Sequence, residues 1–245
     1  MKKLIAYITA GYPDPNFTTD LALSLQEAGV DILELGIAFS DPVADGPVIE
    51  EANLRSLQQG FKMKKLYDMT QEIAPKMETF WMGYFNSFYA QGVQNISQIA
   101  RDLGVKGFII PDLPHEESRV YQPIFQQHQL SLVNFVAPTD GKARIAKIIE
   151  KSQGFIYLVA YAGITGSGTA EDLSSVISEI KATSQTPLYI GFGVDEKSAK
   201  EKSKGVDGVI VGSAFVKVLL DDSLSHSEKI KKICAKARVI KEAIN

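Results

Sequence analysis

Cysteine and histidine are scarce in this 245-residue chain. The single cysteine, Cys234, has no partner for an internal disulfide, and it excludes zinc or redox sites built from Cys-x-x-Cys pairs. Three histidines, His115, His128 and His226, lie far apart in the sequence and argue against a histidine-rich metal site. We therefore expect no bound metal, and we interpret the histidines as peripheral and Cys234 as a core residue of the last helix.

A block of basic residues and a long apolar run are also absent. The chain carries 26 Lys and Arg against 29 Asp and Glu, with both signs mixed along its length, which argues against nucleic acid as a partner. No run is long enough to span a membrane, and no cleavage site follows the short apolar stretch after Lys3. Together with the lone thiol, these absences predict a cytoplasmic protein. The 45% hydrophobic content is that of an ordinary globular chain, so we expect residues 1–245 to form a single domain.

Eight short apolar runs recur along the sequence, and helical spacing of apolar residues follows most of them. Strands are expected near Leu4–Thr9, Ile32–Leu35, Thr79–Met82, Gly107–Ile110, Ser131–Val136, Phe155–Val159, Pro187–Ile190 and Gly208–Val211. Helices are expected over Phe17–Ala28, Ile96–Leu103, Glu116–His128, Arg144–Lys151, Glu171–Lys181 and Ser227–Ala243, with Gly29 and Gly104 as left-handed caps.

Strict alternation of strand and helix implies parallel pairing, and eight such units in this length favour one closed (β/α)8 TIM barrel. An open, doubly wound sheet is the alternative, since the number of strands does not prove closure. In a parallel barrel the active site lies on the loops that follow the strands.

A carboxylate is expected inside the barrel. If Leu33 and Leu35 face the surrounding helices, alternation along the strand turns Glu34 into the lumen. Loss of solvation there raises the pKa of a carboxyl group toward the range in which it both gives and takes protons near neutral pH. The alternative is a Glu paired with a lysine or placed at a solvated strand end. A second acid, Asp45, precedes Gly46 and Pro47, a pattern that by itself also fits a simple turn.

Two late strands end in glycine turns, Gly191-Phe192-Gly193 and Gly212-Ser213. Such turns let backbone N–H groups approach an anion, and a helix starting near Ser213 would direct its positive end to the same point, as in the phosphate sites of many barrels. The segment 160–170 carries three glycines, Gly163, Gly166 and Gly168, which suits a lid over a substrate. Tyr157 and Tyr84 are placed where they line a pocket or fill the core.

The basic cluster of Lys229, Lys231 and Lys232 near the C-terminus is interpreted as a solvated helix face.

In their order and spacing, several motifs resemble the tryptophan synthase alpha subunit family over nearly the whole chain. They are Leu33-Glu34-Leu35-Gly36, Phe39-Ser40-Asp41-Pro42-Val43-Ala44-Asp45-Gly46-Pro47, Ala52-Asn53-Leu54-Arg55, Pro111-Asp112-Leu113-Pro114, Gly163-Ile164-Thr165-Gly166, Gly191-Phe192-Gly193 and Gly212-Ser213-Ala214.

This resemblance implies a lyase of tryptophan biosynthesis, which splits indole-3-glycerol phosphate into indole and glyceraldehyde 3-phosphate by a retro-aldol reaction. It implies no cofactor in this subunit, and a beta-subunit partner that holds pyridoxal phosphate and receives the indole in an α2β2 heterotetramer. By position, Glu34 matches the catalytic acid and base, and Asp45 the second catalytic carboxylate. The substrate-binding residues matched in the same way are Tyr84, Tyr157, Thr165, Gly166, Phe192, Gly193, Gly212 and Ser213.

Two positions depart from the family pattern. Ala38 stands where a proline is usual, and Ala160-Tyr161 replaces the Ser-Arg with which the lid usually begins. Neither change removes a catalytic carboxylate, but the missing arginine bears on lid closure. Two alternative functions stay open at this point: a sugar-phosphate isomerase or epimerase on a similar barrel, and a weakly active subunit that mainly activates its partner.

Overall fold

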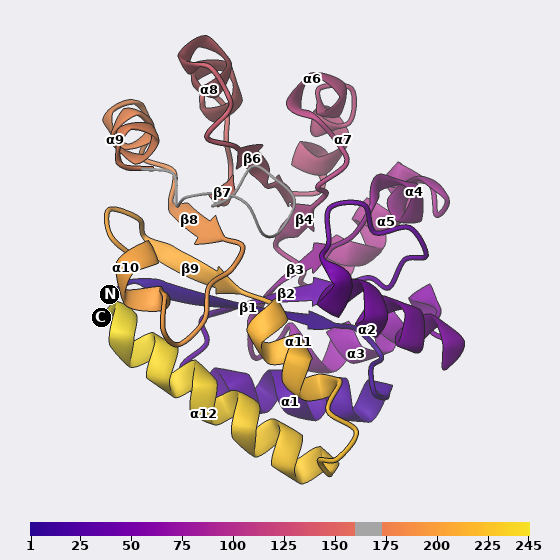
Figure 1. Ribbon diagram of the computed structural model, residues 1–245. Coiled ribbons are helices and arrows are strands. Elements are labelled where there is room, and N and C mark those ends of the chain that lie inside the picture. Colours follow the sequence, from indigo (N-terminus) through magenta and orange to yellow (C-terminus); the bar gives the residue numbers. More distant parts are fainter. Residues whose placement is uncertain (160–172) are drawn as a thin grey trace.

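The computed structural model describes residues 1–159 and 173–245. In these residues nine strands form one all-parallel sheet, in the order β5-β4-β3-β2-β1-β9-β8-β7-β6, which curls into a nearly closed barrel (Figure 1). The strands are β1 Lys3–Thr9, β2 Ile32–Gly36, β3 Glu78–Met82, β4 Gly107–Ile109, β5 Ser131–Leu132, β6 Asn134–Val136, β7 Ile156–Val159, β8 Leu188–Gly191 and β9 Gly208–Val211.

The two end strands of this order, β5 and β6, are one interrupted strand. Only Val133 separates them, and its N–H donates to the carbonyl oxygen of Phe108 in β4 at 3.0 Å. β5 pairs with β4, whereas β6 pairs with β7, so the interruption lies where the ring closes. The predicted strand Ser131–Val136 is therefore β5 and β6 together, and the predicted eight-unit barrel is confirmed over the open sheet.

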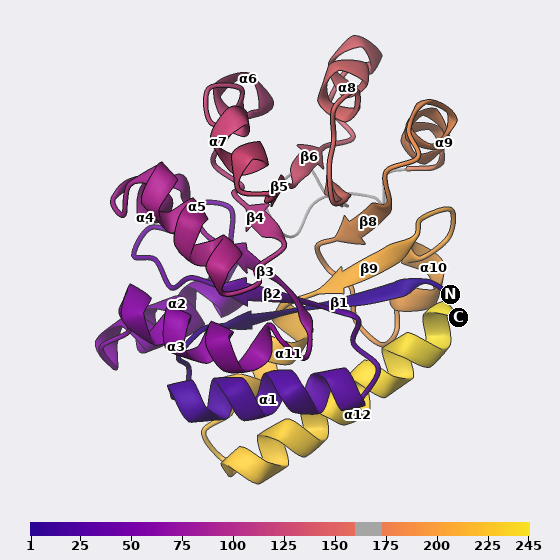
Figure 2. The same cartoon turned by 180° about the vertical axis from the view of Figure 1, so that it is seen from behind.

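Helices surround the strands on the outside, as both ribbon views show (Figures 1 and 2). Their bounds are α1 Pro15–Glu27, α2 Pro47–Gln58, α3 Met63–Ile73, α4 Phe85–Tyr89, α5 Val93–Asp102, α6 His115–Ser118, α7 Gln122–Gln127, α8 Lys142–Ile149, α9 Ser174–Thr183, α10 Ala199–Lys202, α11 Ser213–Leu219 and α12 His226–Ile244. Among the described residues, no helix is both long and apolar enough to cross a membrane.

Local signals account for the helix ends. The Asp14 side chain caps α1 by accepting the N–H of Phe17 at 2.9 Å, and Pro15 occupies the first turn. Gly29 and Gly104 adopt φ of 94° and 84° after α1 and α5, which confirms both as left-handed positions. The helix predicted over Glu116–His128 is instead two short helices, α6 and α7, separated by a turn.

Two predictions about individual side chains are wrong. His128 is buried rather than peripheral, and its Nε2 lies 2.9 Å from the Gln94 amide nitrogen. Lys229 is only 4% exposed rather than solvated, because its ammonium group donates to the Leu219 carbonyl at the end of α11, at 2.7 Å. The Lys229 ammonium group and His128 Nε2 thus each have a polar neighbour that makes burial tolerable, whereas His128 Nδ1 has none among the described residues. Cys234 is buried, as predicted.

The close pairing of β4 and β5 depends on Gly107. A Cβ at this position would lie 2.1 Å from the Ser131 carbonyl oxygen, a backbone atom that cannot move without breaking the strand pair. We expect Gly107→Ala to lower the free energy of unfolding by about 1–3 kcal/mol, the range of overpacked cores. Gly141→Ala is the matched control, because its Cβ would meet nothing within 4 Å. Equal urea-unfolding midpoints for the two variants would contradict this account.

Candidate active site

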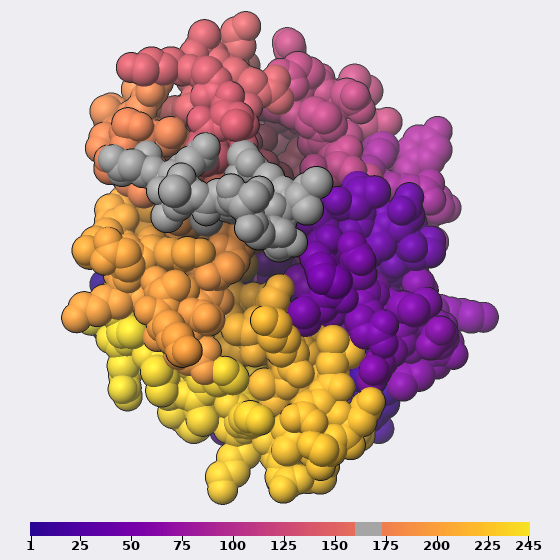
Figure 3. Space-filling model, in the orientation of Figure 1, coloured from indigo at the N-terminus to yellow at the C-terminus, as the bar shows by residue number. Residues whose placement is uncertain are grey.

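A pocket of about 590 Å³ opens at the carboxyl ends of the barrel strands. Figure 3 shows a central hollow where the purple segment after β2 and the orange-to-yellow C-terminal part of the chain meet. Among the described residues, the pocket contains the side chains of both predicted carboxylates, Glu34 and Asp45. Apolar side chains form much of the remaining inner wall, namely Ile49, Met82, Phe135, Tyr157, Phe192 and Ile210.

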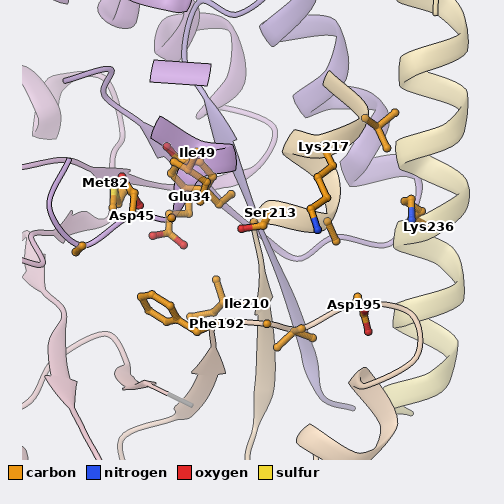
Figure 4. A pocket seen from close by; sticks show the side chains of 18 of the residues that line it. Glu34, Asp45, Ile49, Met82, Phe192, Asp195, Ile210, Ser213, Lys217 and Lys236 are labelled. Carbon is orange, nitrogen blue, oxygen red and sulfur yellow. The ribbon is translucent and has the colours of Figure 1, made fainter. Parts of the chain in front are cut away.

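Glu34 lies in the lumen, as the alternation along β2 predicts. Leu33 and Leu35 are fully buried on the outer side, whereas the Glu34 carboxylate faces the open space of the pocket, opposite Phe192 and Ile210 (Figure 4). The residue is 3% exposed, and its Oε2 has no hydrogen-bond partner among the described residues. Burial, and secondarily the charge of Asp45, raises the pKa of Glu34 to about 8. The carboxyl group is therefore mostly protonated at neutral pH.

Asp45 is held by neighbours that Glu34 lacks. The Tyr84 hydroxyl donates to its Oδ2 at 3.0 Å, and this hydroxyl in turn accepts the N–H of Ala44 at 3.0 Å. Burial raises the pKa of Asp45 to about 6, against the opposing effect of hydrogen bonds from Tyr84 and Asn53. Two carboxyl groups in one pocket are thus set to opposite protonation states near neutral pH, a pattern typical of paired catalytic acids.

Two tyrosines flank Glu34 in the lumen. Tyr7 is its partner in the β1–β2 ladder, and Tyr157 lies on β7. Burial, together with the charges of both carboxylates, raises the pKa of each phenol well above its usual 10, so both stay neutral. Each hydroxyl approaches a glycine closely: a Cβ on Gly36 would lie 2.4 Å from the Tyr7 oxygen, and one on Gly191 would lie 2.2 Å from that of Tyr157.

The two glycine turns lie together at the outer part of this pocket. Gly193, Gly212 and Ser213 all line it, and their N–H groups make no hydrogen bond within the described part of the chain. Phe192 and Gly193 adopt φ of 70° and 65°, and the Lys202 ammonium holds this turn by donating to both of their carbonyl groups, at 2.9 and 2.8 Å. The unpartnered N–H groups are available to an anion.

The structure thus brings together most of the predicted site residues. Glu34, Asp45, Tyr157, Phe192, Gly193, Gly212 and Ser213 line one pocket. Tyr84 is buried behind the pocket wall and contacts it through Asp45 and Ala44. Thr165, Gly166 and Tyr161 lie outside the described residues, and Ala38 is buried.

Sequence reasoning missed Tyr7 and Asn53. The signal for Tyr7 was its alternation with Ile8 on the first strand, which places it on the inner face. No local pattern marks Asn53, because its contact with Asp45 depends on where α2 packs. Elsewhere, no group of three or more His, Cys, Asp or Glu in the described residues is arranged to hold a metal ion.

Comparison with known proteins identifies the enzyme family to which the chain belongs. The family model described as tryptophan synthase alpha chain matches residues 1–245. The chain belongs to the tryptophan synthase alpha chain family. The tryptophan synthase alpha chain of Wolinella succinogenes is 58% identical over 246 residues, covering 100% of this chain and 96% of that relative.

Solved structures agree with this assignment. Tryptophan synthase subunit alpha from Legionella pneumophila has a TM-score of 0.87 at 31% identity, covering 99% of this chain and 92% of that one. Tryptophan synthase from M. tuberculosis has a TM-score of 0.88 at 28% identity, with 99% and 93% covered. The chain is a carbon–carbon lyase of tryptophan biosynthesis, which cleaves indole-3-glycerol phosphate to indole and glyceraldehyde 3-phosphate. The lyase interpretation is thereby confirmed.

The buried Glu34 carboxyl group ties stability to pH. Its pKa is about 8 in the folded chain against 4.5 as the ordinary value, so between these pH values the folded state binds more protons, and stability falls as pH rises. Glu34→Gln removes this titration. Between pH 5 and pH 8.5, the free energy of unfolding of the variant should therefore rise relative to that of the wild type by roughly 4 kcal/mol.

Urea unfolding at several pH values measures this difference. Glu72→Gln, on the exposed face of α3, is the control whose difference from the wild type should stay constant. Parallel stability curves for wild type and Glu34→Gln would show that Glu34 does not bind a proton in the folded state.

Proposed function

We propose that Glu34 and Asp45 carry out the cleavage of indole-3-glycerol phosphate in this chain. The observation that carries the proposal is a buried carboxyl group in the lumen, whose Oε2 has no hydrogen-bond partner in the described residues and whose pKa is raised by burial and by the charge of an aspartate in the same pocket. An acid that can give a proton and an anion that can stabilise positive charge are the two groups that this reaction needs.

In the proposed sequence, Glu34 first donates its proton to carbon 3 of the indole ring. The ring then carries a positive charge shared with its nitrogen and can accept the electron pair of the bond to the side chain. The Glu34 carboxylate next takes the proton of the adjacent side-chain hydroxyl, whose oxygen forms the aldehyde as that bond breaks. The electron pair returns to the ring, indole and glyceraldehyde 3-phosphate separate, and Glu34 regains its proton, so that no net proton is consumed.

Asp45 acts as an ionised partner of the indole N–H in this proposal. A carboxylate accepting that hydrogen bond stabilises the charge that grows on nitrogen in the transition state. The Tyr84 hydroxyl favours the ionised form of Asp45 and fixes its orientation by a hydrogen bond of 3.0 Å. Tyr84 therefore has a positioning role here.

Both ends of the substrate have a place in the pocket. The indole ring suits the apolar wall of Phe135, Tyr157 and Ile210, near both carboxylates. The phosphate suits the unpartnered N–H groups of Gly193, Gly212 and Ser213. The family resemblance adds Thr165 and Gly166 from the segment after β7, and their contacts with substrate stay a prediction.

The proposed chemistry uses only acid, base and electrostatic groups of this chain, and we propose that it needs no cofactor in this subunit. Pyridoxal phosphate is assigned to a beta subunit that receives the indole in an α2β2 assembly. We further propose that residues 1–245 form a single domain and work in the cytoplasm, a reducing compartment that suits the free thiol of Cys234.

Replacing Glu34 with Gln keeps the shape of the side chain but removes its acid and base function. We expect kcat for indole formation to fall by about 10²- to 10⁴-fold, the contribution of a general acid–base group. Indole-3-propanol phosphate is an analogue that lacks the side-chain hydroxyl groups and so cannot be cleaved. Its Kd should change by less than about threefold, because the ring and phosphate contacts remain. Turnover near that of the wild type would show that another group moves the proton.

The exposed apolar side chains Val43 and Leu54 mark the region that we propose for beta-subunit contact. They are 72% and 50% exposed, on the loop that carries Asp45 and on the helix that follows it. A partner docked here would order Asp45 and so raise activity.

We expect added beta subunit to stimulate indole formation by roughly 5- to 100-fold, the usual range of coupling between sites. Leu54→Asp should lose most of this stimulation, whereas Val239→Asp, a change at an equally exposed site on α12, should keep it. Equal stimulation of both variants would show that the beta subunit does not contact Leu54. Stimulation of the partner with no indole formed under any condition would instead indicate an activating subunit.

A further inference from the structure

The pocket extends past the two glycine turns into a charged outer end. Four lysines line this part, Lys197, Lys217, Lys232 and Lys236, together with three carboxylates, Asp195, Glu196 and Asp221. This end adjoins the place proposed for the phosphate. The side chains there decide which charge the outer pocket presents to a substrate.

Local partners engage the three carboxylates and Lys236. Lys236 forms an ion pair with Glu196. Asp195 accepts hydrogen bonds from the hydroxyl and the N–H of Ser198 and lies in the field of Lys197. Asp221 accepts the hydroxyl of Ser223 at 2.5 Å and lies in the fields of Lys232 and Lys229. Of the four lysines, only Lys236 forms an ion pair or a hydrogen bond through its ammonium group in the described residues, whereas Lys197 and Lys232 act on the carboxylates only through their electric fields.

Lys217 differs from the other three lysines in lying on α11, the helix that begins at Ser213. In the described part of the chain, its ammonium group forms no ion pair and no hydrogen bond, although it lines the pocket. Its position on α11 is four residues after Ser213, and residues with this spacing lie on one face of a helix. Helical side chains lean toward the helix N-terminus, so the Lys217 side chain covers the turn that begins at Ser213. Figure 4 shows this chain running back along α11 toward Ser213.

We infer that Lys217 binds the phosphate group of the substrate, as a side-chain cation added to the backbone N–H groups of the glycine turns. This inference rests on the phosphate position given under Proposed function. It assigns to the pocket a selectivity for dianionic substrates, because the ammonium group adds a full positive charge to the partial charges of the backbone N–H groups. The flexible lysine stem also lets the ammonium group follow the phosphate as substrate enters.

The test compares two ligands that differ only in the phosphate, indole-3-propanol phosphate and indole-3-propanol. We expect Lys217→Gln to raise the Kd of the phosphorylated ligand about tenfold, as befits a charged hydrogen bond at a partly exposed site. The Kd of indole-3-propanol should change by less than twofold. Lys217→Arg, which keeps the charge, should recover most of the lost affinity. Titration calorimetry or fluorescence measures each Kd.

Lys231→Gln is the matched control, since it makes the same charge change on an exposed residue outside the pocket. Equal affinity of Lys217→Gln and Lys231→Gln for the phosphorylated ligand would overturn the inference while leaving the glycine-turn site in place. A wild-type protein that binds both ligands equally would instead overturn the proposed phosphate site itself, and the inference with it. An equal loss of affinity for both ligands in Lys217→Gln would show a structural role and would also overturn it.

Discussion

Removal of the Glu34 carboxyl group from water is the physical constraint on which the site depends. Residues 1–159 and 173–245 supply no hydrogen bond to its Oε2, and burial raises its pKa to about 8. A carboxyl group on the molecular surface would be ionised at neutral pH and could not donate a proton. The closed ring of parallel strands is therefore part of the chemistry, because it is the ring that excludes solvent from this position.

Asp45 shows how a different environment changes the same functional group. It stands on the loop between β2 and α2, with the Tyr84 hydroxyl 3.0 Å from its Oδ2. These contacts keep its pKa near 6 although it too is largely buried. A strand therefore holds the proton donor and a loop holds the anion, so that a movement of the loop alone can alter the anion's contact with substrate.

Much of this architecture could be predicted from the sequence, because it follows from periodic patterns. Alternation on β2 placed Glu34 in the lumen, and the repeated strand–helix unit predicted the barrel. Contacts set by tertiary packing could not be predicted in this way. The burial of Lys229 depends on where α11 ends beside α12, and that of His128 on Gln94 of a neighbouring helix. The interruption of the strand Ser131–Val136 at Val133 occurs where the barrel closes, and no local sequence pattern indicates that point.

Gly36 and Gly191 carry a consequence for how this pocket can change over evolution. Each glycine leaves the space that the hydroxyl of Tyr7 or Tyr157 occupies from the adjacent strand. A larger residue at either glycine is compatible only with a smaller residue at its tyrosine, so each pair should vary jointly among descendants of this sequence. A larger residue at either glycine therefore takes two substitutions, with the change at the tyrosine first, which makes this wall of the pocket slow to diverge even where neither residue takes part in the reaction.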